Sequence, residues 1–352
     1  MTSTLTSLAT DRRLATIETI TEISPIPDAD AIVRARVRGW DVVVKKDDFV
    51  VGDLVVYIEV DSFLPVSDPR FEFLIPRGTR TNEQGTEGHP VKTARLRGQY
   101  SQGIAFPVTE FPEAVGAAIG DDLTEALAIT KWDPPLPGEL AASVIGHFPT
   151  SIRTTGELRV QNFAEILGSG SDGNWVATEK VDGTSMTVWT DEDGVHVAGR
   201  NYEFGYNAHQ MFWAKAIELD LHAQLAAEWP GQRAVVQGEL YGAGVLSKNS
   251  LDIKDKRFAA FTVYVDGTEL PRPLWPKSIL DLAVPVYDLP YPATVDEALA
   301  QVDGIKSLIN PKRNAEGVVW RNTASTTVMI GDRPVRASWK CISNRYAMKN
   351  DA

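Results

Sequence analysis

The segment from Trp132 to Pro149 limits what this chain can fold into more than any other part of it. It contains the run Asp133-Pro-Pro-Leu-Pro-Gly138. Proline at this density cannot lie inside a helix or a central strand, because it lacks a backbone N–H and its ring fixes φ. The chain has 352 residues, enough for two separate cores. We therefore predict a first domain over residues 1–130, a linker over 131–149 and a second domain over 150–352.

The two predicted domains differ in pattern. Residues 12–108 show short apolar segments with alternation, separated by turn-rich stretches such as Ser24-Pro-Ile-Pro-Asp28, which predicts a small β-barrel. The second domain mixes types, with a helix expected from Asn207 to Trp229 and another from a capping box at Thr294 to about Leu308. Strands are expected at residues 175–179, 185–189, 194–199, 234–240, 259–265, 317–320 and 335–342. The fold class is therefore α+β, with an antiparallel sheet in the second domain.

One motif stands out in the second domain, Glu179-Lys180-Val-Asp182-Gly183 at the end of an apolar run. Val-Asp-Gly recurs at Val265 and Val302, but neither copy has a lysine two residues before its aspartate. A lysine amine at the end of a strand can act as a nucleophile toward a nucleotide α-phosphate. It must then be unprotonated, so we expect burial or nearby positive charge, including that of a metal, to depress its pKa.

Three other residues, which lie further along the chain, could bind the phosphate, ribose and base of a nucleotide. Arg200 lies in the hairpin Gly199-Arg-Asn201, from which its guanidinium could reach ribose or a phosphate. Glu239 ends an apolar strand beside Gly238 and could accept a hydrogen bond from a sugar hydroxyl. Phe261 lies in an alternating strand and offers an aromatic face to a purine.

Two more residues complete the candidate site. Glu316 precedes the apolar strand Gly317–Trp320, where its carboxylate is suited to a divalent metal, directly or through water. Lys340 is the only lysine of the final strand and could neutralise an α-phosphate. The five histidines and one cysteine show no metal-ligand spacing, so Glu316 is the metal candidate.

In this order, the motifs resemble those of the covalent nucleotidyltransferase superfamily of ligases and capping enzymes, across residues 150–346. Glu179 and Asn201 also match motif positions. The resemblance implies that Lys180 carries AMP, Glu239 contacts ribose, Phe261 stacks on adenine, Glu316 serves the metal step and Lys340 contacts a phosphate.

The order of the domains narrows the resemblance. ATP-dependent DNA ligases and capping enzymes carry a barrel after the nucleotidyltransferase domain, whereas here the barrel comes first. This order, with the stretches Leu96–Gly103 and Arg159–Asn162, is similar to the RNA ligase family typified by the Deinococcus nick-sealing enzyme. It implies an N-terminal OB-like domain and a C-terminal adenylation domain that use ATP and Mg²⁺, or Mn²⁺ in its place. The implied reaction joins a 3′-OH RNA end to a 5′-phosphate in a nicked RNA or RNA–DNA duplex, through lysyl-AMP and an adenylylated strand.

One departure from that pattern concerns the last motif. Related ligases often have Lys-x-Lys, whereas this chain has Lys340-Cys-Ile342. Either one phosphate-binding charge is missing, or Arg336 or Arg345 supplies it.

Composition limits the partners. The net charge of −12 argues against broad adhesion to nucleic acid, because that affinity comes from many lysine and arginine contacts to phosphates. Local basic groups, such as Arg95 with Arg97 or Lys312 with Arg313, leave room for a basic groove. The single cysteine fits a reducing compartment, and no apolar run is long enough for a membrane span. We expect a cytoplasmic protein with no membrane partner.

Other functions fit the same motifs. An adenylyltransferase could pass AMP to a protein or a small molecule, and an ATP-dependent DNA ligase would use the same first step. A nucleic-acid-binding module with a degenerate catalytic domain is a third alternative, against which the intact Lys180, Glu239 and Glu316 argue. The residues alone do not choose ATP over GTP, because an aromatic face accepts either purine, and they predict no oligomeric state.

Overall fold

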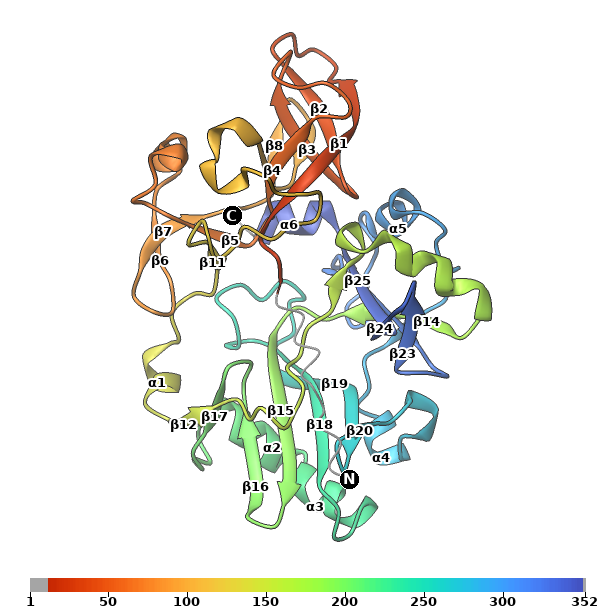
Figure 1. Ribbon diagram of the computed structural model, residues 1–352. Helices are drawn as coiled ribbons and strands as arrows, with labels where there is room; N and C mark the ends of the chain where they lie inside the picture. Colours follow the sequence, from red (N-terminus) through yellow and green to blue (C-terminus); the bar gives the residue numbers. More distant parts are fainter. Residues whose placement is uncertain (1–11, 351–352) are drawn as a thin grey trace. The chain divides into compact units, whose positions relative to one another are not determined.

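The structure is a computed structural model that describes residues 12–350. The chain divides after Leu136 into two compact units (Figure 1). The second unit runs from Pro137 to Tyr346, and the residues from Ala347 onward group with the first. Among the described residues, none of the helices is both long and apolar enough to cross a lipid bilayer.

The first unit is built on a five-stranded antiparallel sheet in the order β10-β4-β1-β2-β3. The long strand β1 pairs with β4 through its first half and with β2 through its second, and its register shifts between Ile20 and Glu22. Such a bulge bends a strand and increases its twist, so the sheet curls. The predicted small barrel is confirmed. The strands are β1 (Ala15–Pro25), β2 (Ile32–Val37), β3 (Trp40–Lys45), β4 (Leu54–Ile58) and β10 (Ile104–Pro107).

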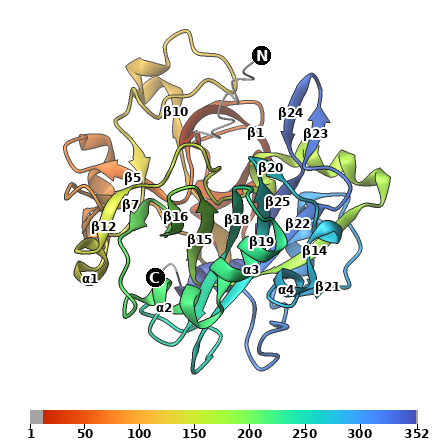
Figure 2. The ribbon, with the colours of Figure 1, turned by 90° about the horizontal axis from the view of Figure 1, so that it is seen from below.

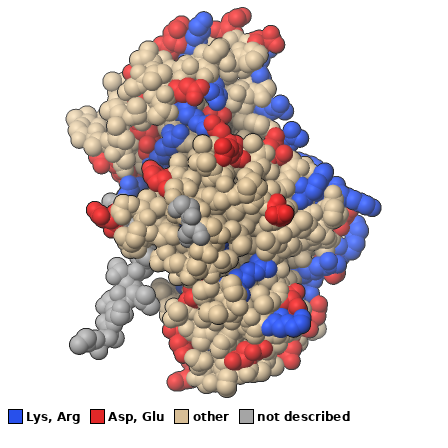
Figure 3. Space-filling model, turned by 90° about the vertical axis from the view of Figure 1, so that its right-hand side faces the viewer, with Lys and Arg blue, Asp and Glu red and all other residues tan. Residues whose placement is uncertain are grey.

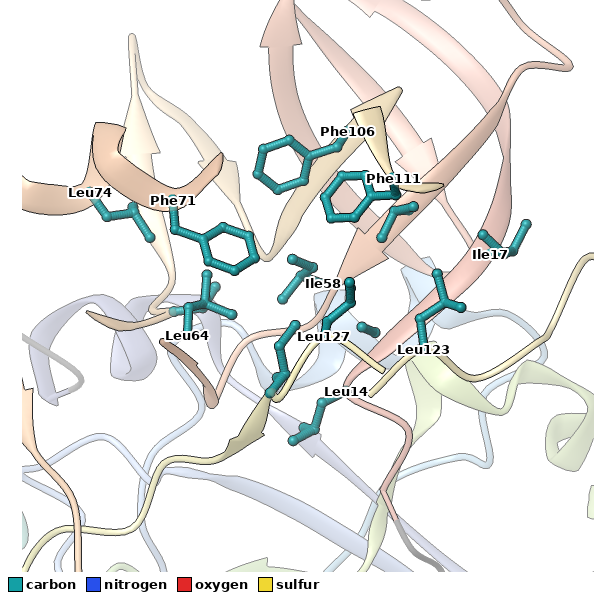
Figure 4. Close-up of a cluster of buried hydrophobic side chains, with 14 residues drawn as sticks. Leu14, Ile17, Ile58, Leu64, Phe71, Leu74, Phe106, Phe111, Leu123 and Leu127 are labelled. Atoms are coloured by element: carbon teal, nitrogen blue, oxygen red, sulfur yellow. The ribbon is translucent and has the colours of Figure 1, made fainter. Parts of the chain in front are cut away.

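A second sheet of this unit has the order β11-β5-β7-β6, and a separate hairpin is formed by β8 and β9. Apolar side chains from β1, β4 and β10 pack with those of the 3₁₀ helix η1 (Pro69–Arg77) into a buried core, in which Ile17, Ile58 and Phe71 are almost fully shielded from solvent (Figure 4). The remaining strands are β5 (Ser62–Pro65), β6 (Arg80–Thr81), β7 (Glu87–Pro90), β8 (Ala94–Leu96), β9 (Gln99–Ser101) and β11 (Thr130–Lys131).

The larger sheet of the second unit is antiparallel, in the order β12-β17-β16-β15-β18-β19-β20. Helices α2 (Met211–Glu218) and α3 (Leu221–Glu228) pack against it (Figure 2). The single helix predicted over Asn207–Trp229 is wrong, because Asp220 takes a left-handed φ of 50° and separates the two helices. The strands are β12 (Val144–His147), β15 (Thr184–Asp191), β16 (Gly194–Ala198), β17 (Tyr202–Phe204), β18 (Ala234–Gly242), β19 (Lys256–Val265) and β20 (Thr268–Glu269).

The other main sheet of this unit has the order β13-β25-β22-β14-β21. Strand β22 pairs antiparallel with both β14 and β25, and a tryptophan from each of these three strands lies in the core on one face. The opposite faces of β14, β22 and β25 are therefore free to form a site. The strands are β13 (Leu158–Arg159), β14 (Trp175–Lys180), β21 (Val286–Tyr287), β22 (Gly317–Asn322) and β25 (Ser338–Ile342).

Two predicted boundaries differ from the structure. The capping box is confirmed, since the Glu297 N–H donates to Thr294 Oγ1, but α5 (Val295–Val302) ends six residues before Leu308, with Gly304 at a φ of 76° soon after. The predicted last strand, residues 335–342, is split at Ala337: β24 (Arg333–Arg336) pairs with β23 (Thr327–Ile330), and β25 follows. Short helices are α4 (Lys277–Leu280) and α6 (Asn344–Asn350).

The proline-rich segment leads into secondary structure within the predicted linker. Pro134, Pro135 and Pro137 occupy the coil between β11 and the short helix α1 (Gly138–Ala141). Strand β12 then adds to the edge of the larger sheet by pairing with β17. Residues 138–147 thus belong to regular elements of the second unit.

Candidate active site

A pocket of about 250 Å³ lies in the second unit, between the faces of its two main sheets. It is lined by residues of β14, β22 and β25 on one side and of β15, β18 and β19 on the other. All seven site residues that the sequence singled out are brought to it: Glu179, Lys180, Arg200, Glu239, Phe261, Glu316 and Lys340.

Lys180 lies at the end of β14, opposite Gly317 of β22. Its Nζ is 2.7 Å from Oε2 of Glu316, the residue that precedes β22. Gly183 and Gly317 permit this close approach of Lys180 and Glu316 because glycine has no side chain. A Cβ on Gly317 would lie 2.1 Å from the backbone oxygen of Cys341, and one on Gly183 would lie 2.2 Å from that of Leu240. The glycines of both motifs are therefore required for close backbone packing beside Lys180 and Glu316.

In the protein without a bound cation, the pKa of Lys180 is raised, and the lowered pKa expected for attack stays a prediction for the metal-bound site. Burial acts to lower the pKa of this amine, but the negative charges of Glu316, Glu239 and Asp182 together outweigh burial, so the pKa of Lys180 is raised. Nearby opposite charges stabilise the ammonium form. Lys180 is thus a protonated, ion-paired group in the protein alone, and nucleophilic attack requires that its proton leave.

Glu239 is a half-buried carboxylate whose loss of solvation is only partly offset by the positive charges near it. It lies on β18 opposite Ser185, and burial raises its pKa to about 8, although Lys180 and Arg200 act in the other direction. Its carboxylate accepts no hydrogen bond from the described part of the chain. A ligand that brings hydroxyl donors or a cation would satisfy this group.

Asp182 is a further member of the site, which sequence reasoning treated only as part of the motif. It lines the pocket, and its carboxylate accepts hydrogen bonds from the hydroxyls of Ser250 and Tyr346. With Glu239 and Glu316 it surrounds Lys180 with carboxylate oxygens, the donors that Mg²⁺ and Mn²⁺ prefer. These residues fit a divalent cation, although the described residues contain no ready-made group of three His, Cys, Asp or Glu ligands around one point. The metal role of Glu316 stays a prediction.

Phe261 enters the pocket because of an irregularity in β19. Gly238 pairs with Ala260 and Gln237 with Thr262, so Phe261 is the extra residue of a β-bulge. A bulge re-aims the side chain at that point, and here the ring is only partly buried and lines the pocket. Strand alternation was the basis for expecting this aromatic at the ligand side, whereas in the structure the bulge turns it toward the pocket; its role in stacking on a base stays a prediction.

Arg321 is a pocket residue that sequence reasoning missed. Its guanidinium carbon is 5.5 Å from the centroid of the Phe261 ring, and its Nη2 donates to Glu157 Oε1 at 2.6 Å. Arg336 donates to the same oxygen at 3.1 Å and to Glu269. This buried ionic network supports one wall of the pocket behind Phe261. No sequence motif marks it, because its members come from four separate segments.

Lys340 lines the pocket from β25, where it pairs in register with Val319. The position of the missing second lysine, Ile342, is buried opposite Gly317. Neither of the two arginines considered as substitutes lines this pocket. Arg336 is held in the network described above, and the exposed Arg345 pairs with Asp303 at 3.0 Å and does not line the pocket. The pocket cations are Lys180, Arg200, Arg321 and Lys340.

Glu179 lies next to Lys180 but its carboxylate is engaged elsewhere. It accepts hydrogen bonds from the Ser307 hydroxyl at 2.5 Å and from the backbone N–H groups of Leu308 and Ile309. Neighbouring side chains of a strand point to opposite faces, so Glu179 fixes a loop while Lys180 faces the pocket. The cofactor-binding role predicted for Glu179 stays a prediction.

Comparison with known proteins agrees with this arrangement. Residues 14–108 match an OB-fold domain, and residues 173–342 match the RNA ligase family. No curated protein sequence gives a significant match.

Among solved structures, the chain is similar to an RNA ligase of Naegleria gruberi with PPi, at 34% identity and a TM-score of 0.83, covering 97% of this chain and 99% of that one. A glutamate-to-alanine variant of that enzyme with AMP and Mn gives 35% identity, a TM-score of 0.84 and the same coverage. A lysine-to-alanine variant with ATP and Mn gives 34%, a TM-score of 0.83, and coverage of 96% and 99%. The chain therefore belongs to the RNA ligase family.

Proposed function

We propose that this protein is an ATP- and divalent-cation-dependent RNA ligase that joins a 3′-OH RNA end to a 5′-phosphate at nicks, through a covalent AMP on Lys180. The observation that carries the proposal is the ring of carboxylates around the Lys180 amine, in one pocket with Phe261 and Lys340. The membership of this chain in the RNA ligase family, and its structural similarity to an RNA ligase solved with ATP, AMP or PPi, support the same chemistry.

The residues have separable tasks in nucleotide binding. Phe261 offers one ring face to adenine, while Arg321 lies against the ring and is held by Glu157. Glu239 accepts hydrogen bonds from ribose hydroxyls, which satisfies a carboxylate that is otherwise buried without donors. Arg200 and Lys340 contribute positive charge for the phosphates. A divalent cation, when bound by these carboxylates, supplies charge that favours the neutral amine and offsets the α-phosphate.

The first step requires a proton transfer. Glu316 Oε2, 2.7 Å from Lys180 Nζ, is positioned to take the proton of the amine. The amine then attacks the α-phosphorus of ATP, so that a P–N bond forms and the bond to the bridging oxygen breaks, releasing pyrophosphate. In the second step an oxygen of an RNA 5′-phosphate attacks the same phosphorus, and the P–N bond breaks to return Lys180. In the third step a 3′-hydroxyl attacks the activated 5′-phosphate and AMP leaves.

The test uses nicked duplexes that differ only in the sugar at the 3′-OH end. The protein is incubated with ATP labelled at the α-phosphate and Mg²⁺, the adduct is isolated, and each nicked duplex is added. The proposal predicts that label leaves the protein and sealed product appears with a ribonucleotide end. Sealing of deoxyribonucleotide ends alone would make the protein a DNA ligase. An adduct that no strand discharges would instead indicate an adenylyltransferase with a protein or small-molecule acceptor.

A further inference from the structure

We propose that the β8–β9 hairpin of the first unit is a docking surface for the sugar-phosphate backbone of RNA. The inference rests on the proposed function, which supplies a nucleic-acid partner. The hairpin joins Ala94–Leu96 to Gln99–Ser101 through Arg97 and Gly98, whose φ values of 47° and 85° suit the tight turn that fits the twist of antiparallel strands. It packs against β3 through β9 (Figure 1).

The hairpin lies in a stretch of chain that contains no acidic residue. From Gly88 to Thr109 there is no Asp or Glu, whereas Lys92, Arg95 and Arg97 are basic. The face in Figure 3 shows basic and acidic side chains together over its upper part and a gathering of basic side chains at its right-hand edge. The local excess of positive charge from Gly88 to Thr109 matches the charge of a polynucleotide backbone, within a protein whose net charge is −12.

The two hairpin arginines differ from those arginines of the same unit that carboxylates hold. Arg95 and Arg97 are exposed, and neither makes an ion pair with any described residue. By contrast, carboxylates hold five other arginines of this unit: Arg12 with Glu59, Arg34 and Arg36 with Asp41, Arg38 with Glu18, and Arg70 with Glu113. The hairpin charges are therefore available to an external anion.

Arg95 is held in position by its neighbours. It lies directly across from Tyr100, and its guanidinium carbon is 5.4 Å from the centroid of the Tyr100 ring. Its Nε donates to the backbone oxygen of Gly98 at 3.0 Å, which leaves the terminal nitrogens without a partner in the described chain. Little side-chain entropy then remains to be lost when those nitrogens bind a phosphate.

The base of the hairpin is fixed to the core of the barrel. Ser101 Oγ accepts from the Val43 N–H at 2.9 Å, and the backbone oxygen of Gln102 accepts from the Tyr57 hydroxyl at 2.8 Å. Gly103 has a φ of 97°, and a Cβ there would lie 2.6 Å from the backbone oxygen of Ile58. A rigid base with exposed cations at its tip is suited to positioning a strand.

The geometry of the hairpin favours contacts to the phosphate backbone of RNA over contacts to its bases. Arg95 covers one face of Tyr100, so the ring is a poor platform for a stacked base, whereas two guanidiniums suit phosphate oxygens. Phosphate contacts carry no direct sequence information, so this surface fixes the position of the substrate whatever its sequence.

The test compares two double variants of the full-length protein. Arg95→Gln with Arg97→Gln removes the hairpin charges. Arg77→Gln with Arg80→Gln removes two exposed arginines of η1 and β6, which make no ion pair in the described chain, and so changes the net charge equally. Binding to a nicked duplex with a ribonucleotide 3′ end is measured by fluorescence anisotropy at several salt concentrations, and adduct formation with ATP is measured alongside.

For the hairpin variant we expect affinity to fall about 5- to 20-fold at low salt, and the slope of log affinity against log salt to fall by about 1 to 2. Adduct formation should be unchanged, and the η1–β6 variant should bind RNA as the wild type does. An unchanged affinity and slope, or an equal loss in both variants, would overturn the docking surface. Lost adduct formation with intact RNA binding would also overturn it, by placing the hairpin in the nucleotide step. A wild-type protein that binds RNA but forms no adduct would instead refute the proposed function.

Discussion

At the scale of single residues, the site raises the pKa values of two half-buried groups, Lys180 and Glu239. Lys180 is held as an ammonium by surrounding carboxylates, and burial raises the pKa of Glu239 to about 8. The pocket of the protein alone thus carries carboxylates that a nucleotide and a cation would satisfy. Groups with perturbed pKa values gathered in one pocket are typical of sites that carry out chemistry.

Glu239 gives a pH-dependent prediction for the protein without nucleotide or metal. Between its ordinary pKa of 4.5 and its folded pKa of about 8, the folded state holds a proton that the unfolded state has lost. The free energy of unfolding therefore decreases as pH rises through this window. Glu239→Gln removes that loss, so we expect the variant to be more stable than wild type by about 1 to 3 kcal/mol at pH 8.5, and little different at pH 4.5.

Thermal unfolding at the two pH values would measure the effect of Glu239→Gln. Glu192→Gln is the matched control, because Glu192 is an exposed acid in the same sheet region and its removal changes the net charge equally. A Glu239→Gln variant that is no more stable than wild type at pH 8.5 would show that the raised pKa is wrong.

At the scale of elements, the positions of the strands along the chain were easier to predict than the irregularities that shape the pocket. Apolar runs bounded by glycine and charged residues located β14, β18, β19 and β22, because alternation and turn residues are local signals. The break at Asp220 has no proline or glycine to mark it. The bulge at Phe261 depends on pairing with β18, and Arg321 depends on Glu157, 164 residues away. Such features are set by tertiary contacts that one sequence does not display.

The bulge in β19 leads to a prediction for nucleotide affinity. Phe261→Ala removes the ring that the bulge presents to the pocket, so ATP should bind more weakly by about 1 to 3 kcal/mol, or about 5- to 150-fold. Isothermal titration with ATP would measure it. Tyr264→Phe is the control on the same strand, because Tyr264 is buried outside the pocket and its hydroxyl has no partner in the described chain. Equal ATP affinity for wild type and Phe261→Ala would assign the base to another surface.

At the scale of the whole molecule, each unit has its own core and its own task. The first is an OB-fold domain whose β8–β9 hairpin we assign to RNA, and the second contains the whole pocket. The order of motifs along residues 180–340 predicted the members of that pocket, because most of the functional residues lie on or next to apolar strands of the two main sheets that line it. The charge state of Lys180 was not predictable in the same way, since it depends on three carboxylates that only the fold brings together.

The central claim is that Lys180 is the residue that carries AMP. The most direct measurement is peptide mass mapping of the protein after incubation with ATP and Mg²⁺, for wild type, Lys180→Ala and the control Lys277→Ala, whose lysine is exposed outside the pocket. We predict one added AMP on the peptide that contains Lys180 in wild type and in the control, and none in Lys180→Ala. An AMP on any other residue, or an adduct that persists in Lys180→Ala, would contradict the account.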